Sequence, residues 1–257
     1  MRWHLLITPP LPGADNMALD EALLERAGAT GEAVCRVYSW SRPTLSLGRN
    51  QTAAGHYDLA LGRELGVDIV RRPTGGRAVL HHREITYAVA APAPETGSLR
   101  ESYAAVNRLL HDALARLGAA VRDAEPAGRA PVPSLAPCFE LPTRDELILD
   151  GRKLVGSAQW RDNGAFLQHG SILVDDDQPL IARLLTRPVT TKMLPPATLR
   201  EALGRAPAPE ELAAALLASV RELEDPDAGP WEVDGALQAA TDRLRTRYLD
   251  DAWTWRR

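Results

Sequence analysis

Apolar and polar residues recur with two different periods along this chain, and the periods divide it into segments. Apolar side chains lie three or four positions apart over residues 15–27, which predicts an amphipathic helix that Asp15 or Asn16 can cap. The period then changes to two in short runs rich in β-forming residues. These runs span residues 33–40, 44–49, 67–72, 77–82 and 84–91. Because only turn-length connections separate the last three, we expect an antiparallel meander.

The second half of the chain predicts a long helix, a set of hairpins and then further helices. Residues 98–121 are helical in period, with Ser98 as N-cap, Glu101 as its capping-box partner and Gly118 as a stop. Residues 146–177 hold three alternating runs joined by Asp-Gly and Asp-Asn-Gly, which are typical hairpin turns. The rest is rich in alanine and again helical in period. These elements predict the α+β class.

Composition and charge narrow the kind of protein. The chain has 257 residues, of which 45% are hydrophobic and 25% charged, and its formal net charge is -4. This profile is that of an ordinary soluble globular protein with one large domain, although two small domains remain possible. The negative net charge is unlike that of a typical nucleic-acid-binding protein. No apolar run is long enough for a membrane span and the N-terminal segment is unlike a signal peptide, so we expect a cytoplasmic protein.

The lysines and cysteines are few enough for each to be a candidate. Only Lys153 and Lys192 are lysines among the 30 basic residues, and Lys192 lies in a polar segment that favours the surface. Two cysteines cannot form a disulfide framework. Cys35 lies in an alternating run and is expected to be a buried apolar residue. Cys138 ends an irregular loop after Pro137, from which a thiol can face a cleft, although a buried structural cysteine is the other interpretation.

The segment RRPTGGRAVLHH, residues 71–82, is a candidate ligand-binding loop. Gly75 and Gly76 can form a plain turn between strands, or they can let backbone N–H groups approach an anionic or carbonyl-bearing ligand. The flanking Arg72, Arg77 and His81 favour the second interpretation slightly. The segment lacks the Gly-Lys-Ser/Thr ending of a Walker loop.

The remaining polar candidates have simple structural alternatives. His81 and His82 are adjacent on a predicted strand, so they point to opposite faces and only one can line a given site. His169 can be a core histidine bonded to the backbone. Lys153 can be an exposed hairpin residue, although the small residues after it would let a ligand lie against the strand. No Cys or His pair has a convincing zinc spacing, and we expect no metal site.

Four segments, taken in order, resemble the lipoate-protein ligase and octanoyltransferase family. They are SLGRNQ at 46–51, RRPTGGRAVLHH at 71–82, PCFELP at 137–142 and GRKLVGSAQWRDNGAFLQHGSILV at 151–174. The resemblance implies a mixed, largely antiparallel sheet with packed helices, as in biotin protein ligases and class II aminoacyl-tRNA synthetases. It also implies one catalytic domain over residues 1–257, with a core at about 31–222 and a helical C-terminal extension.

The resemblance also implies an acyl tunnel beside the 71–82 segment. Cys138 and Lys153 would be catalytic, with Lys153 meeting the acyl carbonyl, while Arg72 and His81 would shape the polar end of the tunnel. The full set of substrate-binding residues that it implies is Arg72, Gly75, Gly76, Arg77, Ala78, His81, Gly156, Ser157, Ala158, His169 and Gly170.

The family includes several chemistries, and the Cys-Phe pair at 138–139 is similar to that of LipM-type octanoyltransferases. These hold octanoate on the cysteine as a thioester. The resemblance therefore implies octanoyl transfer from acyl carrier protein to a lysine of a lipoyl domain, such as the glycine cleavage H protein or a 2-oxoacid dehydrogenase E2. No cofactor, nucleic acid or membrane is implied. Two alternatives stay open: an ATP- and Mg-dependent lipoate ligase, because GRNQ is common in ligases, and an amidotransferase between lipoyl domains.

Overall fold

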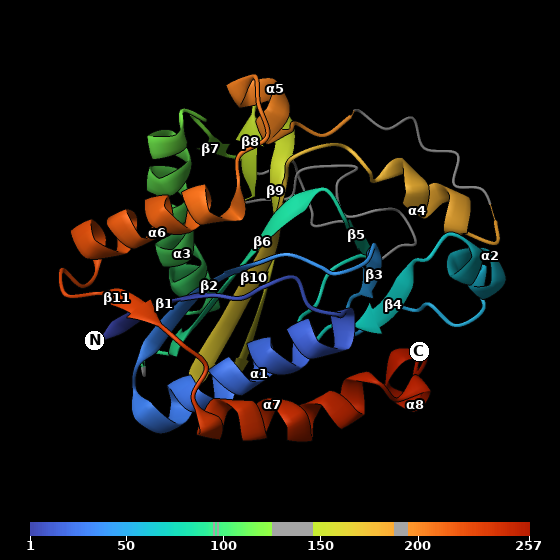
Figure 1. Ribbon diagram of the computed structural model, residues 1–257, viewed down its shortest axis with the longest axis horizontal. Coiled ribbons are helices and arrows are strands. Elements are labelled where there is room, and N and C mark those ends of the chain that lie inside the picture. The colour runs from blue at the N-terminus through green and yellow to red at the C-terminus, as the bar shows by residue number, and fades with distance from the viewer. Residues whose placement is uncertain (95, 97, 125–145, 188–194) are drawn as a thin grey trace.

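The computed structural model describes residues 1–94, 96, 98–124, 146–187 and 195–257, and an eight-stranded mixed sheet forms its centre (Figure 1). The order is β11-β1-β2-β6-β10-β9-β8-β7. The strands are β1 (Trp3–Ile7), β2 (Ala33–Tyr38), β6 (Glu84–Pro92), β7 (Arg122–Asp123), β8 (Leu147–Leu149), β9 (Arg152–Asp162), β10 (Ala165–Leu173) and β11 (Gly229–Trp231). Strand β1 pairs with β11 and β2 in parallel, and the pairs from β2 to β7 are antiparallel. The predicted α+β class with a largely antiparallel sheet is confirmed.

Helices cover both faces of this sheet. One face carries α1 (Gly13–Thr30), on which α7 (Gly235–Tyr248) packs, and the other carries α3 (Leu99–Leu117) and α6 (Pro209–Leu223) (Figure 1). Successive side chains of β6 point to opposite faces of the sheet. Ala88 and Ala90 belong to the core under α1, while Tyr87 and Val89 belong to the core under α3. A strand buried on both faces therefore divides two apolar cores.

The expected antiparallel meander is wrong. A separate three-stranded sheet contains β3 (Thr44–Leu47), β4 (Asp68–Arg71) and β5 (Val79–His81) in the order β4-β3-β5, and β3 pairs with β4 in parallel. Parallel pairing needs a long crossover, and the connection between β3 and β4 supplies one that includes α2 (Leu59–Glu64). The sequence periodicity did not reveal this short helix.

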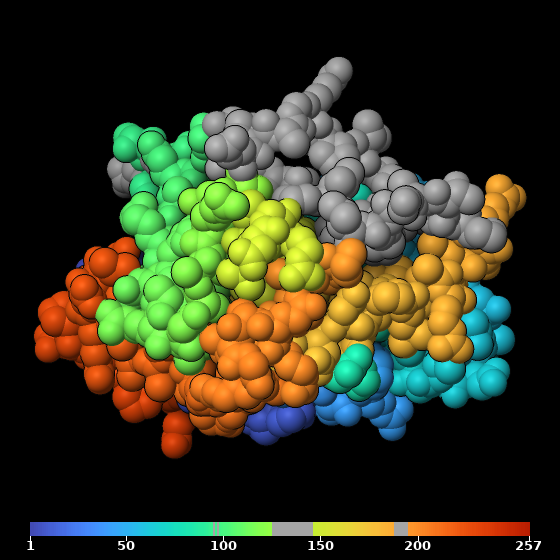
Figure 2. Space-filling model, turned by 90° about the horizontal axis from the view of Figure 1, so that it is seen from above, coloured from blue at the N-terminus to red at the C-terminus, as the bar shows by residue number. Residues whose placement is uncertain are grey.

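The short helices complete the outer surface. They are α2, α4 (Pro179–Leu184), α5 (Leu199–Leu203) and α8 (Asp251–Thr254). Seen from above, α3, the β8–β9 hairpin, α5 and α4 follow one another across this end of the molecule (Figure 2).

Local sequence signals predicted the ends of α3 correctly and the start of α1 incorrectly. Ser98 and Glu101 form the predicted capping box of α3, and Gly118 ends the helix in a left-handed conformation. The predicted cap of α1 is wrong, because the helix begins at Gly13 after Pro12 and no side chain caps it. Asn16 is instead buried, and its amide donates to the carbonyls of Leu11 and Ser39. Tertiary contacts therefore use a residue whose type suggested a local role.

A buried ion pair joins α1 to the sheet. Arg36 of β2 and Asp20 of α1 are both completely buried, and the Nη1 atom of Arg36 lies 2.6 Å from Oδ1 of Asp20. Tyr38 donates its hydroxyl to Oδ2 of Asp20 at 2.8 Å, and Asn16 and Thr8 accept from Arg36. Burial alone would raise the pKa of Asp20, but the neighbouring Arg36 and the hydrogen bonds outweigh it and lower the pKa. The carboxylate is therefore ionised at neutral pH.

Replacing Asp20 should destabilise the protein far more than replacing a surface carboxylate of the same helix. Asp20→Asn leaves the Arg36 cation buried without its counter-charge, and we expect a loss of about 3–5 kcal/mol in the free energy of unfolding. Glu25→Gln is the matched control, since Glu25 pairs with Arg243 at the surface of α1 and should change stability by less than about 1 kcal/mol. Urea unfolding of both variants measures the difference. Equal losses would mean that the pair does not hold α1 to the sheet.

Candidate active site

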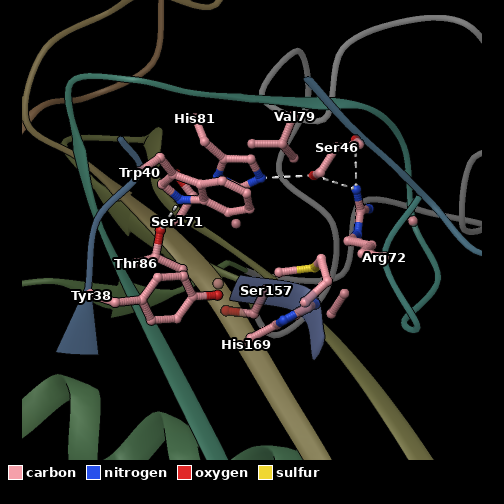
Figure 3. A pocket seen from close by; sticks show the side chains of 15 residues that line it. Tyr38, Trp40, Ser46, Arg72, Val79, His81, Thr86, Ser157, His169 and Ser171 are labelled. Atoms are coloured by element: carbon pink, nitrogen blue, oxygen red, sulfur yellow. Dashed lines mark hydrogen bonds between the residues drawn. The ribbon is translucent and has the colours of Figure 1, made fainter. Parts of the chain in front are cut away.

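A narrow cavity lies between the α1 side of the main sheet and the small sheet. It holds about 420 Å³ of empty space, its open mouth included. Met17 of α1 and Tyr38 of β2 line it from one side, and Ser46 of β3 and Val79 of β5 line it from the other. Figure 3 shows Tyr38 of the main sheet and Ser46 and Val79 of the small sheet pointing toward one space.

Most of the residues that the sequence singled out for substrate binding meet at this cavity. The lining includes Arg72, Gly76, His81, Gly156, Ser157, Ala158, His169 and Gly170. Three others lie between β4 and β5 and are absent from the lining that the structure describes: Gly75, Arg77 and Ala78. The loop and the β9–β10 pair therefore converge on one cavity.

Arg72 holds the 73–77 loop rather than presenting free donors. Its guanidinium donates to the carbonyls of Gly75 at 2.7 Å and Arg77 at 2.8 Å, and also to the carbonyl and hydroxyl of Ser46. Gly76 has a φ of +95°, a conformation that favours glycine. Because one planar fork binds both ends of the turn, the loop has a fixed shape at the cavity wall.

A second glycine, Gly48, lets the loop approach β3. A Cβ atom at Gly48 would lie 2.0 Å from the carbonyl oxygen of Gly76 and 2.8 Å from its carbonyl carbon. No side chain fits against a backbone at that distance. The glycine of the SLGRNQ motif therefore permits the close packing of two backbone segments, a role that the sequence did not reveal.

His81 belongs to a hydroxyl–imidazole–carboxylate chain in the cavity wall. Its Nε2 atom lies 2.7 Å from the Ser46 hydroxyl, and its Nδ1 atom lies 2.7 Å from Oε1 of Glu84. A carboxylate only accepts, so Nδ1–H donates to Glu84 and Nε2 can accept from Ser46. The Trp40 ring stacks on His81 at a centroid distance of 4.1 Å, and its Nε1–H donates to Thr86 (Figure 3). His82 lies just past the end of β5 and is exposed, with its ring beside Asp177.

His169 forms a second chain of the same kind. Its Nδ1 atom lies 2.8 Å from Oδ2 of Asp20, and its Nε2 atom lies 2.6 Å from the hydroxyl of Thr74 in the 73–77 loop. Burial lowers the pKa of His169 below its ordinary value, although the hydrogen bond and charge of Asp20 act in the opposite direction. A neutral ring that donates through Nδ1 accepts from Thr74 through Nε2. His169 therefore links the buried Asp20–Arg36 ion pair to the 73–77 loop.

Of the two candidate catalytic residues, the structure describes only Lys153. Lys153 is buried, and its Nζ atom lies 2.6 Å from Oε1 of Glu146; it is absent from the described cavity lining. It precedes by three residues Gly156, which does line the cavity. Cys138 lies outside the residues that the structure describes. Cys35 is buried in β2, as predicted, and burial raises the pKa of its thiol to about 12.

Several residues of the cavity and its hydrogen bonds were not individually singled out from the sequence. Trp40, Ser46 and Thr86 line the cavity, Glu84 accepts from His81, and the types of all four are ordinary for strands. Only their meeting in space makes a network. In the described ranges, no group of three or more His, Cys, Asp or Glu side chains is arranged to hold a metal ion. Among the described helices, none has the length and apolar character needed to cross a membrane.

Gly48→Ala should disrupt the cavity wall, whereas Gly75→Ala should not. The added methyl at position 48 overlaps the backbone of Gly76, so we expect a loss of about 1–3 kcal/mol in stability and displacement of the loop. A Cβ atom at Gly75 meets nothing within 4 Å, and the stability of that variant should stay within about 0.5 kcal/mol of wild type. Thermal and urea unfolding compare the two. Equal stabilities would show that the close approach at Gly48 is not required.

Comparison with known proteins agrees with this geometry. The model of the lipoyl protein ligase A/B catalytic domain matches residues 12–221. Octanoyltransferase LipM of Kyrpidia tusciae is 38% identical in an alignment of 272 positions, gaps included, that covers 99% of each chain. Octanoyltransferase LipM of Carboxydothermus hydrogenoformans is 42% identical over 187 residues, covering 71% of this chain and 69% of that protein.

Solved structures show the same fold at lower identity. A lipoate-protein ligase A bound with ATP has a TM-score of 0.80 and 21% identity, with 99% of each chain covered. The bipartite lipoate protein ligase of Thermoplasma acidophilum has a TM-score of 0.79 and 20% identity, covering 99% of this chain and 96% of that one. The match over residues 12–221 and the long, similar relatives lead to one conclusion: the chain belongs to the lipoyl protein ligase A/B catalytic domain family.

Proposed function

We propose that this protein is an acyltransferase that moves an octanoyl group from acyl carrier protein to a lysine of a lipoyl domain. The group would be held on Cys138 as a thioester between the two steps. Support comes from relatives named octanoyltransferase LipM, two of which are 38% and 42% identical to this chain. The acceptor is the lipoyl domain of an E2 or H protein.

The observation that carries the proposal is the narrow cavity beside the 73–77 loop. The side chains of Met17, Trp40 and Val79 give it apolar walls, and Gly76 and Gly156 leave space between those walls because they carry no side chain. A medium-length acyl chain matches such a slot, since apolar contact along a flexible chain is favourable only where the walls are close. The polar groups of His81 and His169 are fully engaged with neighbours and therefore add little cost to an apolar occupant.

The thiol chemistry points to Cys138 by elimination. The chain has two cysteines, and a nucleophilic cysteine must be available as a thiolate. Cys35 is 1% exposed and its pKa is raised to about 12 by burial, so it remains a protonated thiol at neutral pH. Cys138 is the remaining candidate, and it lies in the Cys-Phe pair of the family resemblance.

The proposed reaction has two acyl-transfer steps. In the first, the Cys138 thiolate attacks the thioester carbonyl of the donor, the new C–S bond forms, and the carrier leaves as a thiolate that takes up a proton. In the second, the ε-amino group of the acceptor lysine, as the neutral amine, attacks the acyl-enzyme. The C–N bond forms, the C–S bond to Cys138 breaks, and the proton lost from nitrogen restores the thiol.

Lys153 is the proposed electrostatic partner in both steps. An ammonium near the thiol stabilises the thiolate and the oxyanion that develops on the carbonyl. The Lys153 side chain is 1% exposed, and Glu146 accepts from its Nζ atom at 2.6 Å, just after the segment that contains Cys138. Because the charge is compact and held by a buried carboxylate, its position is specific.

The thioester can be tested directly. Wild-type protein incubated with octanoyl-acyl carrier protein should gain one octanoyl group that hydroxylamine removes, as measured by intact mass. Cys138→Ala should gain none, and Cys35→Ala should still gain one. An adduct retained in Cys138→Ala would contradict the proposal.

The same assay separates the alternative donors. Addition of a lipoyl domain should move the octanoyl group to the acceptor without ATP. Transfer that requires both ATP and free octanoate would identify a ligase, and transfer only from an octanoylated lipoyl domain would identify an amidotransferase.

Lys153→Arg should fold normally and transfer slowly. The guanidinium keeps the charge opposite Glu146 but is wider than the ammonium, so it cannot place that charge at the same point. We expect single-turnover transfer to fall at least roughly tenfold, or about 1.4 kcal/mol of barrier. The reverse change at the adjacent Arg152, Arg152→Lys, is the control, since Arg152 pairs with Glu201 at the surface. Wild-type turnover by Lys153→Arg would remove Lys153 from the mechanism.

A further inference from the structure

Three arginines gather around one tryptophan beside the cavity loop. The guanidinium carbons of Arg256, Arg247 and Arg49 lie 4.1, 4.7 and 5.9 Å from the centre of the Trp253 ring. Arg49 also lies 4.5 Å from the centre of the Trp160 ring. We call Arg49, Arg247 and Arg256 the arginine platform. Stacking on aromatic faces holds these cations in place without neutralising them.

Neighbouring carboxylates in the described ranges neutralise only part of the positive charge of the platform. Arg247 pairs with Glu21 of α1. Within the described ranges, neither Arg49 nor Arg256 has a carboxylate within ion-pair distance. The pKa of Arg256 is lowered first by burial and then by the charges of Arg49, Arg257 and Arg247, which shows that the cations repel one another. In a chain with a net charge of -4, such a concentration of guanidinium groups is complementary to an anion.

The platform adjoins the loop that lines the proposed acyl slot. The backbone N–H of Arg49 donates to the carbonyl of Thr74 at 2.8 Å, and the preceding Gly48 packs against Gly76, which lines the cavity. Trp160 follows the lining residue Ala158 by two positions on β9. The C-terminal helix α8 brings Trp253 and Arg256 beside β4, where Figure 1 shows the C-terminus. A partner bound to the platform would therefore stand next to the slot.

We propose that the arginine platform docks the acyl donor, an acidic carrier protein whose thioester arm is attached through a phosphodiester. This inference rests on the proposed function. Guanidinium groups suit phosphate and carboxylate oxygens because their planar forks can donate two parallel hydrogen bonds. Two of the three arginines have no competing carboxylate in the described structure, so an anion can approach without displacing one.

The charge favours the donor over the acceptor as the occupant. The acceptor must bring a lysine to the slot, and at neutral pH that lysine approaches as an ammonium. The guanidinium groups of the arginine platform repel this cation locally. The donor brings a thioester, which has no charge, on an arm that carries a phosphate. Opposite charges on donor and platform would also speed their encounter, by 10-fold to 10³-fold at low salt in comparable cases.

The test compares one double variant with a control of equal charge change. Arg49→Gln/Arg256→Gln removes two platform cations while keeping polar side chains. Arg243→Gln/Arg245→Gln removes two exposed arginines of α7 that pair with Glu25 and Asp15. The measurement is the second-order rate constant of acyl-enzyme formation, followed by intact mass, with octanoyl-acyl carrier protein as donor. Octanoyl-N-acetylcysteamine, which has neither protein nor phosphate, serves as the second donor.

We expect the platform variant to react about tenfold more slowly than wild type with the carrier-protein donor at low salt. The difference should disappear near 1 M salt, where the screening length is about 3 Å, and it should be absent with octanoyl-N-acetylcysteamine. The control variant should match wild type throughout. Acylation of the wild type by neither donor would refute the proposed function itself.

Three results would overturn the docking proposal while leaving the proposed function intact. One is a platform variant that reacts with the carrier-protein donor at the wild-type rate. Another is equal slowing with octanoyl-N-acetylcysteamine, which would assign the arginines to the loop. The third is normal loading followed by slow transfer from the preloaded variant to the lipoyl domain, which would place the acceptor on the platform.

Discussion

The structure depends on one buried carboxylate, that of Asp20. It accepts from Arg36 and Tyr38 of β2 and from His169 of β10, so a single residue of α1 connects the helix with two strands. Burying this charge is costly, and only the full set of partners compensates for it. His169 then carries the constraint to Thr74 at the cavity wall. The packing of α1 on the sheet and the position of the 73–77 loop are consequently one arrangement.

A second carboxylate, Glu84, performs a related task at the other side of the cavity. It accepts from His81, Thr86 and Ser171, and His81 in turn contacts Ser46, which accepts from Arg72. Each of these side chains has a partner within the network. Such networks favour one conformation because a shifted member leaves a buried group unsatisfied. A slot that must measure the length of a flexible acyl chain benefits from walls of this kind.

Local signals allowed part of this structure to be predicted. The capping box of α3 and the Asp-Gly hairpin between β8 and β9 depend on neighbours in sequence, so both can be predicted from the sequence alone. The alternation around Cys35 likewise identified a buried strand residue. The small sheet was missed because its pairing depends on a crossover and on contacts far apart in sequence. Asp20 was missed for the same reason, since a carboxylate in an amphipathic helix is ordinarily expected at the surface.

The use of arginine in this chain explains how the cavity rim is held. Arg71 is fully buried and donates to the main-chain oxygens of Gly48, Gln51 and Thr254 at 2.6–2.8 Å. Burial, followed by the charges of neighbouring arginines, lowers its pKa to about 10, so it stays protonated at neutral pH. One guanidinium can bind carbonyls from several segments at once, whereas an ammonium has three donors around one atom. Arg71 therefore joins the 48–51 loop to the C-terminal helix, while Arg72 shapes the next loop. A lysine at either position would leave carbonyls of the rim without donors, which gives a physical reason for so few lysines at this site.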